Sequence, residues 1–385
     1  MSSFLLKKKS QKTLEEKIAK KSPRTQEEYR LVIKQFQKFC WEFYDGRTDK
    51  EIFDELSILK ESEQNSAIYD VLQNWIDWNY GHNVLTSTLK QYFSILKQYF
   101  HYCGFRLHPQ DIKDNIEFKK RIKEELYALQ IEDIQKIFTV VKPRMRGFYL
   151  ALISTGARPG ELLQVKKQDI DFSHKRIKIT IHPENVKTGQ GRSIWLTKEA
   201  GAYLTMRVRD LNDEDLVWTT NENPMLAEKN ASKTFSRYCD QVGFTERYHS
   251  NNYRKITLYS FRSYFFNLAA DVHREGYAHR MTGHGGYLPQ YDRMSDEKKA
   301  DWFLKLEPHL LIDDSERKTE EIAMLTRKNI DNEHLIARIT KLEKEKQGSD
   351  ELKSLIDEYL KDYFEDIFSK IEFTKNKPHK NIITS

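Results

Sequence analysis

The chain has 385 residues, of which 38% are hydrophobic and 32% charged, with only 15 Gly and 9 Pro. This length suggests two or three domains, and the 20 Tyr and 21 Phe argue against disorder over most of the chain. A loop-rich β-sandwich is disfavoured, no apolar run is long enough to cross a bilayer, and the three scattered cysteines form no disulfide framework. We therefore expect a mainly helical protein in a reducing, cytoplasmic setting.

Residues 1–21 are a basic arm. Residues 1–30 hold nine Lys or Arg and four Glu, so most of the net charge of +6 lies at this end. Such an arm can lie along phosphates or a membrane surface, or it can be a solvated tail, and the sequence leaves these interpretations open. The first lysines of the arm are Lys7, Lys8, Lys9 and Lys12.

Residues 22–103 are predicted to form a compact helical domain. Thr25 and Glu28 fit a capping box at the start of the first helix, and apolar residues then recur at helical spacing as far as Phe43. Two further helices follow, the second of them beginning near Thr86. The apolar stripes of these two helices are Ile68, Leu72, Trp75 and Ile76, then Leu89, Tyr92, Phe93, Leu96, Tyr99, Phe100 and Cys103.

Residues 104–125 are predicted to be a linker, because a Gly and a Pro break the helix and a highly charged segment follows. Residues 126–312 form a second domain, helical except for a short β section. Apolar and polar residues alternate over 177–181, a polar Gly-containing turn follows, and 193–196 is the returning strand. The fold class is thus mainly α with a small antiparallel β-sheet.

Residues 313–385 are predicted to be a charged helical extension. Apolar residues and two asparagines there follow heptad a and d spacing over fewer than three clean heptads. A short coiled coil and a solvated amphipathic helix both remain open. The heptad positions are Ile322, Leu325, Asn329, Asn332, Ile336 and Ile339.

The first candidate for chemistry is Thr-Gly-Ala-Arg-Pro-Gly-Glu-Leu at 155–162. Gly156 can adopt a positive φ and end one helix, and Pro159 suits the first turn of the next. Arg158 lies at this junction beside an apolar run. A buried guanidinium group needs a partner, which is either Glu161, three residues on, or a bound phosphate.

Two further segments carry cations in unusual places. Lys187 opens the polar turn of the hairpin, where it could donate a proton or bind a phosphate, or could be an ordinary exposed lysine. In Tyr259-Ser-Phe-Arg262, Ser260 is predicted to cap a helix, which puts Arg262 in the first turn. The helix dipole disfavours a cation there, so an anionic partner is indicated.

The last candidate is the Gly-rich segment 282–293, which contains His284 followed by Tyr287 and Tyr291. A phenol can attack phosphorus when nearby cations lower its pKa from about 10. Taken singly, each tyrosine is more common as a packing residue.

The ordered combination of these residues resembles the tyrosine recombinase (phage integrase) family over roughly residues 22–312. The ending Tyr-Asp-Arg and the acidic helix after it look most like archaeal integrases of viruses or mobile elements. Matched in order are the first-box Arg158 and Glu161, the hairpin Lys187, the second-box Tyr259 and Arg262, the third-box His284 and the nucleophile Tyr291.

This resemblance implies a site-specific recombinase that cuts and rejoins duplex DNA through a 3′-phosphotyrosine, as a tetramer on the recombining attachment sites. It implies no metal, ATP or other cofactor and no membrane partner. Arg158 and Arg262 would clamp the phosphate, with hydrogen bonds from His284 and Tyr259. Lys187 would protonate the leaving 5′-oxygen.

The supporting residues follow from the same resemblance. Glu161 would orient the Arg158 region, and Arg192 at the end of the hairpin turn would join the basic arm in binding DNA. Residues 22–103 would be the core-binding domain, which clamps DNA together with a catalytic domain at 126–312.

Two departures from the family pattern keep alternatives open. Tyr259 stands where the second box usually has His, and the short interval from His284 leaves Tyr287 as a rival to Tyr291. The other functions considered are DNA relaxation of the type IB topoisomerase kind and a catalytically silent DNA-binding protein of the same fold.

Overall fold

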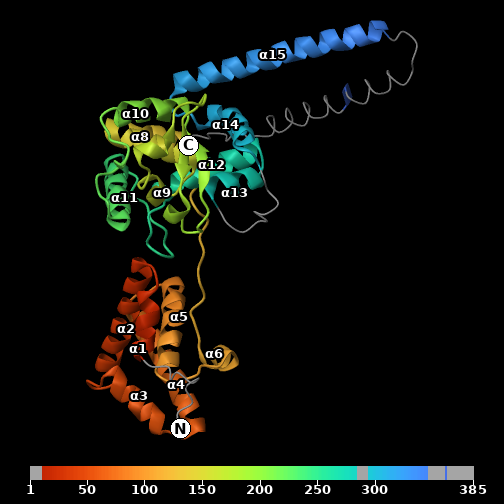
Figure 1. Ribbon diagram of the computed structural model, residues 1–385. Coiled ribbons are helices and arrows are strands. Elements are labelled where there is room, and N and C mark those ends of the chain that lie inside the picture. Colours follow the sequence, from red (N-terminus) through yellow and green to blue (C-terminus); the bar gives the residue numbers. More distant parts are fainter. Residues whose placement is uncertain (1–10, 284–293, 346–359, 362–385) are drawn as a thin grey trace, which may run out of the picture. The chain divides into compact units, whose positions relative to one another are not determined.

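The computed structural model describes residues 11–283, 294–345 and 360–361 (Figure 1). The chain divides into two compact units, one of Met1–Tyr127 with Glu246–Lys255 and the other of Ala128–Thr245 with Ile256–Ser385. Both are mainly helical, and the described sheet is small and antiparallel, so the predicted fold class is confirmed. The described part of the chain contains no helix that is both long enough and apolar enough to span a membrane.

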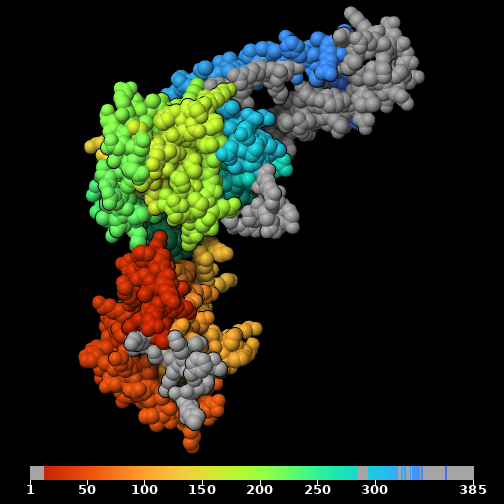
Figure 2. All heavy atoms as spheres, viewed as in Figure 1, coloured from red at the N-terminus to blue at the C-terminus, as the bar shows by residue number. Residues whose placement is uncertain are grey.

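The first unit is a bundle of helices around an aromatic core. Phe36, Trp75 and Phe100 are fully buried. The rings of Phe36 and Phe100 pack edge to face, with their centroids 5.4 Å apart. Figure 2 draws this unit in space-filling form, with its described helices in red to orange. Its helices are α1 (Gln11–Ala19), α2 (Pro23–Phe43), α3 (Asp49–Ile58), α4 (Glu61–Gly81), α5 (Thr86–Tyr102) and α6 (Pro109–Asn115).

The start of α2 corrects the predicted capping box. The helix begins two residues before Thr25, because Pro23 occupies its first position and Ser22 is the N-cap, whose side chain accepts a hydrogen bond from the Thr25 amide. Proline is favoured at that position since its missing N–H would have no helical partner there. The last residue of the predicted stripe, Phe43, is 48% exposed.

The segment predicted as a linker contains structure of its own. Helix α6 lies within it, and Ile116, just after this helix, is buried in the core of the first unit. Farther along, the Glu124 carboxylate accepts hydrogen bonds from the backbone amides of His249 and Ser250. The domain limits at 104–125 stay a prediction.

The second unit surrounds helix α8, which is buried from Gly147 to Thr155. Helix α12 packs against α8 and α13 (Figure 1). The helices are α7 (Ile131–Phe138), α8 (Pro143–Thr155), α9 (Pro159–Leu162), α10 (Lys198–Val208), α11 (Pro224–Gln241), α12 (Leu258–Val272), α13 (Glu275–Thr282), α14 (Asp296–Leu310) and α15 (Asp314–Glu345), with 3₁₀ turns η1 (Lys167–Asp169) and η2 (Pro183–Asn185).

The sheet has three antiparallel strands in the order β1 (Ile170–Asp171), β2 (Lys178–Ile181) and β3 (Arg192–Trp195). Ile179 pairs with Ile194, and both are fully buried, so the predicted hairpin is confirmed. Strand β1 was not predicted, because two residues are too few to show a period. The chain between β2 and β3 includes the 3₁₀ turn η2, so it is longer than a simple hairpin turn.

A separate apolar cluster joins β3 to α12, α13 and α14. Its centre is built from Trp195, Phe265, Met281 and Phe303, all of which are buried. Beside it the Asp296 carboxylate accepts hydrogen bonds from Ser193 and Lys299. Burial raises the pKa of Asp296, but these hydrogen bonds outweigh it and lower the pKa to about 2. Because the apolar cluster includes Trp195 of β3 and Met281 of α13, it holds the end of α13 beside β3.

The predicted C-terminal helix is present as α15, which runs for 32 residues. Among its described side chains, Ile322, Leu325 and Ile336 are more than half exposed. Coiled-coil pairing along this face stays a prediction.

Candidate functional site

The first-box turn is shaped by its glycine and proline. Gly156 ends α8 with φ of 58°, in the left-handed region that favours glycine. The Thr155 hydroxyl accepts the amide of Ala157, and Pro159 takes the first position of α9. Arg158 is thereby held in an extended conformation at the start of α9, with 22% of its side chain exposed.

Glu161 is the hub of the site. This buried carboxylate accepts from Arg158 Nη1 at 2.7 Å and from the Arg158 amide at 3.0 Å. It also accepts from Arg192 Nη2 at 2.6 Å. Burial raises the pKa of Glu161, but the two guanidinium groups outweigh burial and leave the pKa below its ordinary value. The predicted ion pair of Arg158 with Glu161 is confirmed, and Arg192 is an unpredicted second partner.

Arg192 crosses from the sheet to the end of α13. Its Nε donates to the carbonyl oxygen of Met281 at 2.8 Å, and its side chain is only 8% exposed. A Cβ on Gly283 would lie 2.7 Å from Arg192 Nη1, so the glycine allows this close approach. The expected role of Arg192 in DNA binding stays a prediction, since its observed contacts are with Glu161 and α13.

The second box enters from α12. Arg262 is buried and donates from Nη1 to the carbonyl oxygen of Gly156 at 2.7 Å. Burial and the positive charge of Arg158 lower the pKa of Arg262 to about 10. The predicted cap is corrected, because Thr257 is the N-cap and Ser260 lies three residues later, its hydroxyl accepting the Thr257 amide. Arg262 consequently lies beyond the first turn of α12, where the helix dipole destabilises a cation less.

Two guanidinium nitrogen atoms in this cluster have no hydrogen-bond partner among the described residues. They are Arg192 Nη1 and Arg262 Nη2, and both atoms are buried. Arg158 and Arg192 share the Glu161 carboxylate, and Arg262 donates to the Gly156 carbonyl oxygen, so these two acceptors cannot satisfy all the donors of the three arginines. A buried donor without an acceptor is costly, so the cluster favours an anion with several oxygens, such as a phosphate.

Tyr259, one turn before Arg262, is 47% exposed and forms the accessible side of the cluster. Its hydroxyl donates to Glu228 Oε1 of α11 at 2.9 Å. Burial and the Glu228 carboxylate raise the pKa of Tyr259 to about 12, against the opposing effect of Arg158 and Arg262. The phenol is therefore a neutral hydrogen-bonding group near neutral pH. Glu228 was not predicted, because nothing in the sequence of α11 separates it from an ordinary helix carboxylate.

The remaining predicted residues are not joined to the cluster by the described contacts. Lys187 is exposed after η2, and no hydrogen bond or ion pair among the described residues links its amine to the arginines. His284, Tyr291 and the rival Tyr287 lie outside the described residues, as do Lys7, Lys8 and Lys9. Lys12 falls in α1, where its side chain is not described.

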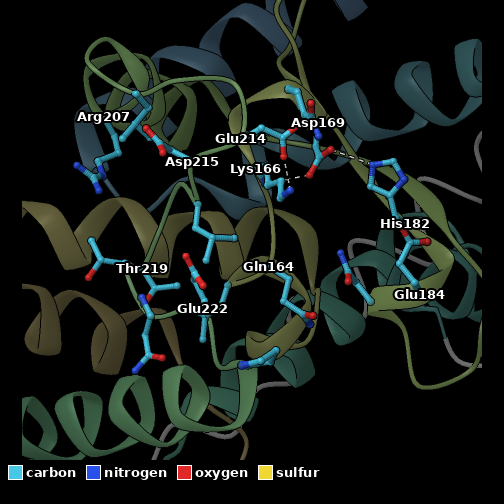
Figure 3. A pocket seen from close by; sticks show the side chains of 18 residues that line it. Gln164, Lys166, Asp169, His182, Glu184, Arg207, Glu214, Asp215, Thr219 and Glu222 are labelled. Carbon is cyan, nitrogen blue, oxygen red and sulfur yellow. Dashed lines mark hydrogen bonds and ion pairs between the residues drawn. The ribbon is translucent and has the colours of Figure 1, made fainter.

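A polar cavity of about 800 Å³ in the second unit is a separate feature (Figure 3). Four of its polar side chains form two pairs: His182 lies 2.9 Å from Asp169, and Lys166 pairs with Glu214. None of the three arginines of the cluster lines it. No described residue that lines the cavity has a buried donor without a partner, as Arg192 and Arg262 of the arginine cluster have.

Comparison with known proteins identifies the domain that carries this cluster. Residues 125–261 match the phage integrase family. This match covers about a third of the chain. The matched stretch of this domain includes Arg158, Glu161, Lys187, Arg192 and Tyr259 and ends one residue before Arg262.

Individual proteins to which the chain is similar are distant. A tyrosine recombinase XerC-like protein of Caldanaerobacter subterraneus subsp. tengcongensis is 28% identical over 116 residues, covering 28% of this chain and 30% of the relative's length. A solved lambda integrase dimer bound to a COC′ core site is 18% identical, with a TM-score of 0.49, over 74% of this chain and 79% of that chain. A XerA recombinase structure is 17% identical, with a TM-score of 0.35, over 76% of this chain and 96% of that chain.

Proposed function

We propose that the chain is a site-specific DNA recombinase that cuts and rejoins duplex DNA through a 3′-phosphotyrosine. The observation that carries the proposal is the arginine cluster, in which buried guanidinium donors of Arg192 and Arg262 lack acceptors within a phage integrase family domain. A backbone phosphate of duplex DNA supplies the required oxygens. Guanidinium groups match phosphate geometry because their donors lie in a rigid plane.

The proposed reaction begins with attack on the phosphorus by the Tyr291 phenolate, which forms when the phenol gives up its proton to solvent. The bond from the phenol oxygen to phosphorus forms as the bond from phosphorus to the 5′-oxygen breaks. Arg158 and Arg262 stabilise the charge that grows on the non-bridging oxygens, a kind of contact whose loss costs about 3–4 kcal/mol. Lys187 donates the proton that the 5′-oxygen gains, and general acid catalysis contributes about 10²–10⁴-fold. The phosphotyrosine keeps the phosphodiester energy, so a 5′-hydroxyl can reverse the step.

The surrounding biology follows as part of the proposal. The pattern around Tyr291 supports an archaeal integrase of a virus or mobile element, which would act on attachment sites in double-stranded DNA inside a cell. Exchange between two duplexes requires four strand cleavages, and hence four protomers on the DNA.

The proposal is tested with a nicked duplex taken from the ends of the element that encodes the chain. The nick lets the short leaving strand diffuse away, so that a covalent protein–DNA adduct accumulates. We expect the adduct with the unaltered chain and with Tyr287→Phe, and none with Tyr291→Phe. The measurement is denaturing gel electrophoresis of labelled DNA.

The other outcomes decide between the alternatives. If no variant forms an adduct with any such duplex, the chain is a DNA-binding protein that does not cleave. An adduct lost only in Tyr287→Phe would assign the nucleophile to the rival tyrosine. An adduct together with relaxation of supercoiled DNA, but with no exchange between two duplexes, would favour the topoisomerase alternative.

A further inference from the structure

The hydroxyl of Tyr259 is already engaged by a carboxylate. The hydroxyl donates a hydrogen bond to Glu228 Oε1 at 2.9 Å, which joins α11 to α12. The second oxygen, Glu228 Oε2, lies 3.2 Å from the place that a Cβ on Gly160 would occupy. The carboxylate thus lies between Tyr259 and the first turn of α9, which begins immediately after Arg158.

This arrangement puts two acceptors in competition for one donor. An ionised carboxylate only accepts hydrogen bonds, and so does a phosphate diester oxygen. The single O–H of Tyr259 can point fully at one of them. A histidine at this position could carry a proton on each ring nitrogen and serve both, whereas a phenol has one proton. The carboxylate also adds a negative charge beside the cluster, and like charges repel.

We propose that Glu228 competes with the bound phosphate for the Tyr259 hydroxyl and so restrains phosphate binding at the arginine cluster. Glu228 is a positioning residue that acts through Tyr259. Without a phosphate the hydroxyl is held by the carboxylate, and when a phosphate enters the hydroxyl turns from Glu228 to a phosphate oxygen. The inference rests on the proposed function, because it takes the cluster to be the phosphate site.

The test is calorimetric titration of inorganic phosphate at constant ionic strength into the full chain carrying Tyr291→Phe, which excludes covalent chemistry. Glu228→Gln keeps the size of the side chain and removes its charge. We expect phosphate to bind roughly tenfold more tightly, an effect on the scale of a single close charge. Glu222→Gln, an exposed carboxylate in the loop before α11, makes the same change in net charge and should leave the affinity unchanged.

The route through the hydroxyl is tested by adding Tyr259→Phe. The gain from Glu228→Gln should largely disappear in that background, because there is no longer a proton to compete for. Glu228→Ala, which removes the acceptor altogether, should also tighten binding, and circular dichroism checks that each variant is folded.

Three results would overturn the inference: no phosphate binding in any variant, no gain beyond that of Glu222→Gln, or a full gain that persists with Tyr259→Phe. The proposed function fails separately, by the absence of a DNA adduct in the chain that retains Tyr291. A gain in phosphate affinity without any adduct would leave the competition standing and remove the recombinase.

Discussion

At the scale of single residues, the site depends on one buried carboxylate. Glu161 holds Arg158 and Arg192 with all three of its described bonds and is itself only 3% exposed. Desolvating such a carboxylate is costly unless it is paired, and here two cations offset that cost. These hydrogen bonds hold the partly exposed side chain of Arg158 in a fixed orientation.

Replacing Arg192 by Met should therefore destabilise the protein. The change leaves Glu161 buried with Arg158 alone, and breaking a buried pair costs about 3–5 kcal/mol. The folded-state pKa of Glu161 lies below its ordinary 4.5, so its stabilising contribution is present above that pH and is lost as the pH falls. The difference in unfolding free energy between Arg192→Met and the unaltered chain should be full at pH 7 and shrink below about pH 4.5. Urea unfolding at several pH values measures it.

Arg176 offers a matched control, because it pairs with another buried carboxylate, Glu307, at 2.6 Å. Arg176→Met should also lower stability, yet it should leave phosphate affinity at the cluster unchanged. If Arg192→Met leaves the unfolding free energy at pH 7 within about 0.5 kcal/mol of the unaltered chain, the hub role of Glu161 is wrong.

The sequence predicted the members of this cluster better than their partners. Arg158 with Glu161 was predictable from their spacing of three residues, and Arg262 from its place in a family pattern. Glu228 and the bond of Arg192 to Glu161 were not, because both depend on helices and strands far apart in the chain meeting in space. The spacing of residues within one segment of the sequence does not indicate such long-range contacts.

At the scale of elements, helix ends decide how the site is presented. Helix α8 ends at Gly156, whose carbonyl oxygen receives Arg262, and α13 ends at Gly283 beside Arg192. Each glycine has a positive φ and a close neighbour where a side chain would be. These two turns thus combine a backbone requirement with a packing requirement.

Gly156→Ala should be more damaging than an alanine at an ordinary helix end. Its Cβ would lie 2.4 Å from Phe265 Cδ1 in the buried core, in addition to the strain of φ at 58°. Gly243, after α11, has φ of 84° and no described atom within 4 Å of its Cβ, so Gly243→Ala carries the backbone cost alone. We expect a loss of about 1 kcal/mol for Gly243→Ala and about 3 kcal/mol or more for Gly156→Ala. Denaturant unfolding of both variants compares them, and equal losses would refute the packing argument.

Most long elements were predictable because they are strongly periodic. Helices α2, α4, α5 and α7 each place apolar residues on one face, and the hairpin strands β2 and β3 alternate. The errors fall where a capping choice or a short element decides: Ser22 caps α2, Thr257 caps α12, and β1 has only two residues. A few hydrogen bonds decide where such an element begins or ends, and the periodic spacing of apolar residues does not encode them.

At the scale of the whole molecule, the distribution of charge matters more than its total. The net charge of +6 is modest for 385 residues, but the basic arm carries much of it. Helix α1, which follows the first lysines, is anchored by Leu14 and Ile18, both buried in the core of the first unit. The arm is therefore attached to a folded unit, and its lysines can be changed without removing core residues.

Replacing Lys7, Lys8 and Lys9 by Ala should weaken binding to duplex DNA and reduce its salt dependence. Each lost phosphate contact lowers the slope of log K against log salt by about 0.9, so three contacts would remove nearly 3 from the slope. The unfolding free energy should stay the same, because Leu14 and Ile18 remain. Replacing the same three lysines by Arg keeps the charge and should preserve the slope. Fluorescence anisotropy across a salt series measures it, and an unchanged slope in the Ala variant would show that the arm is a solvated tail.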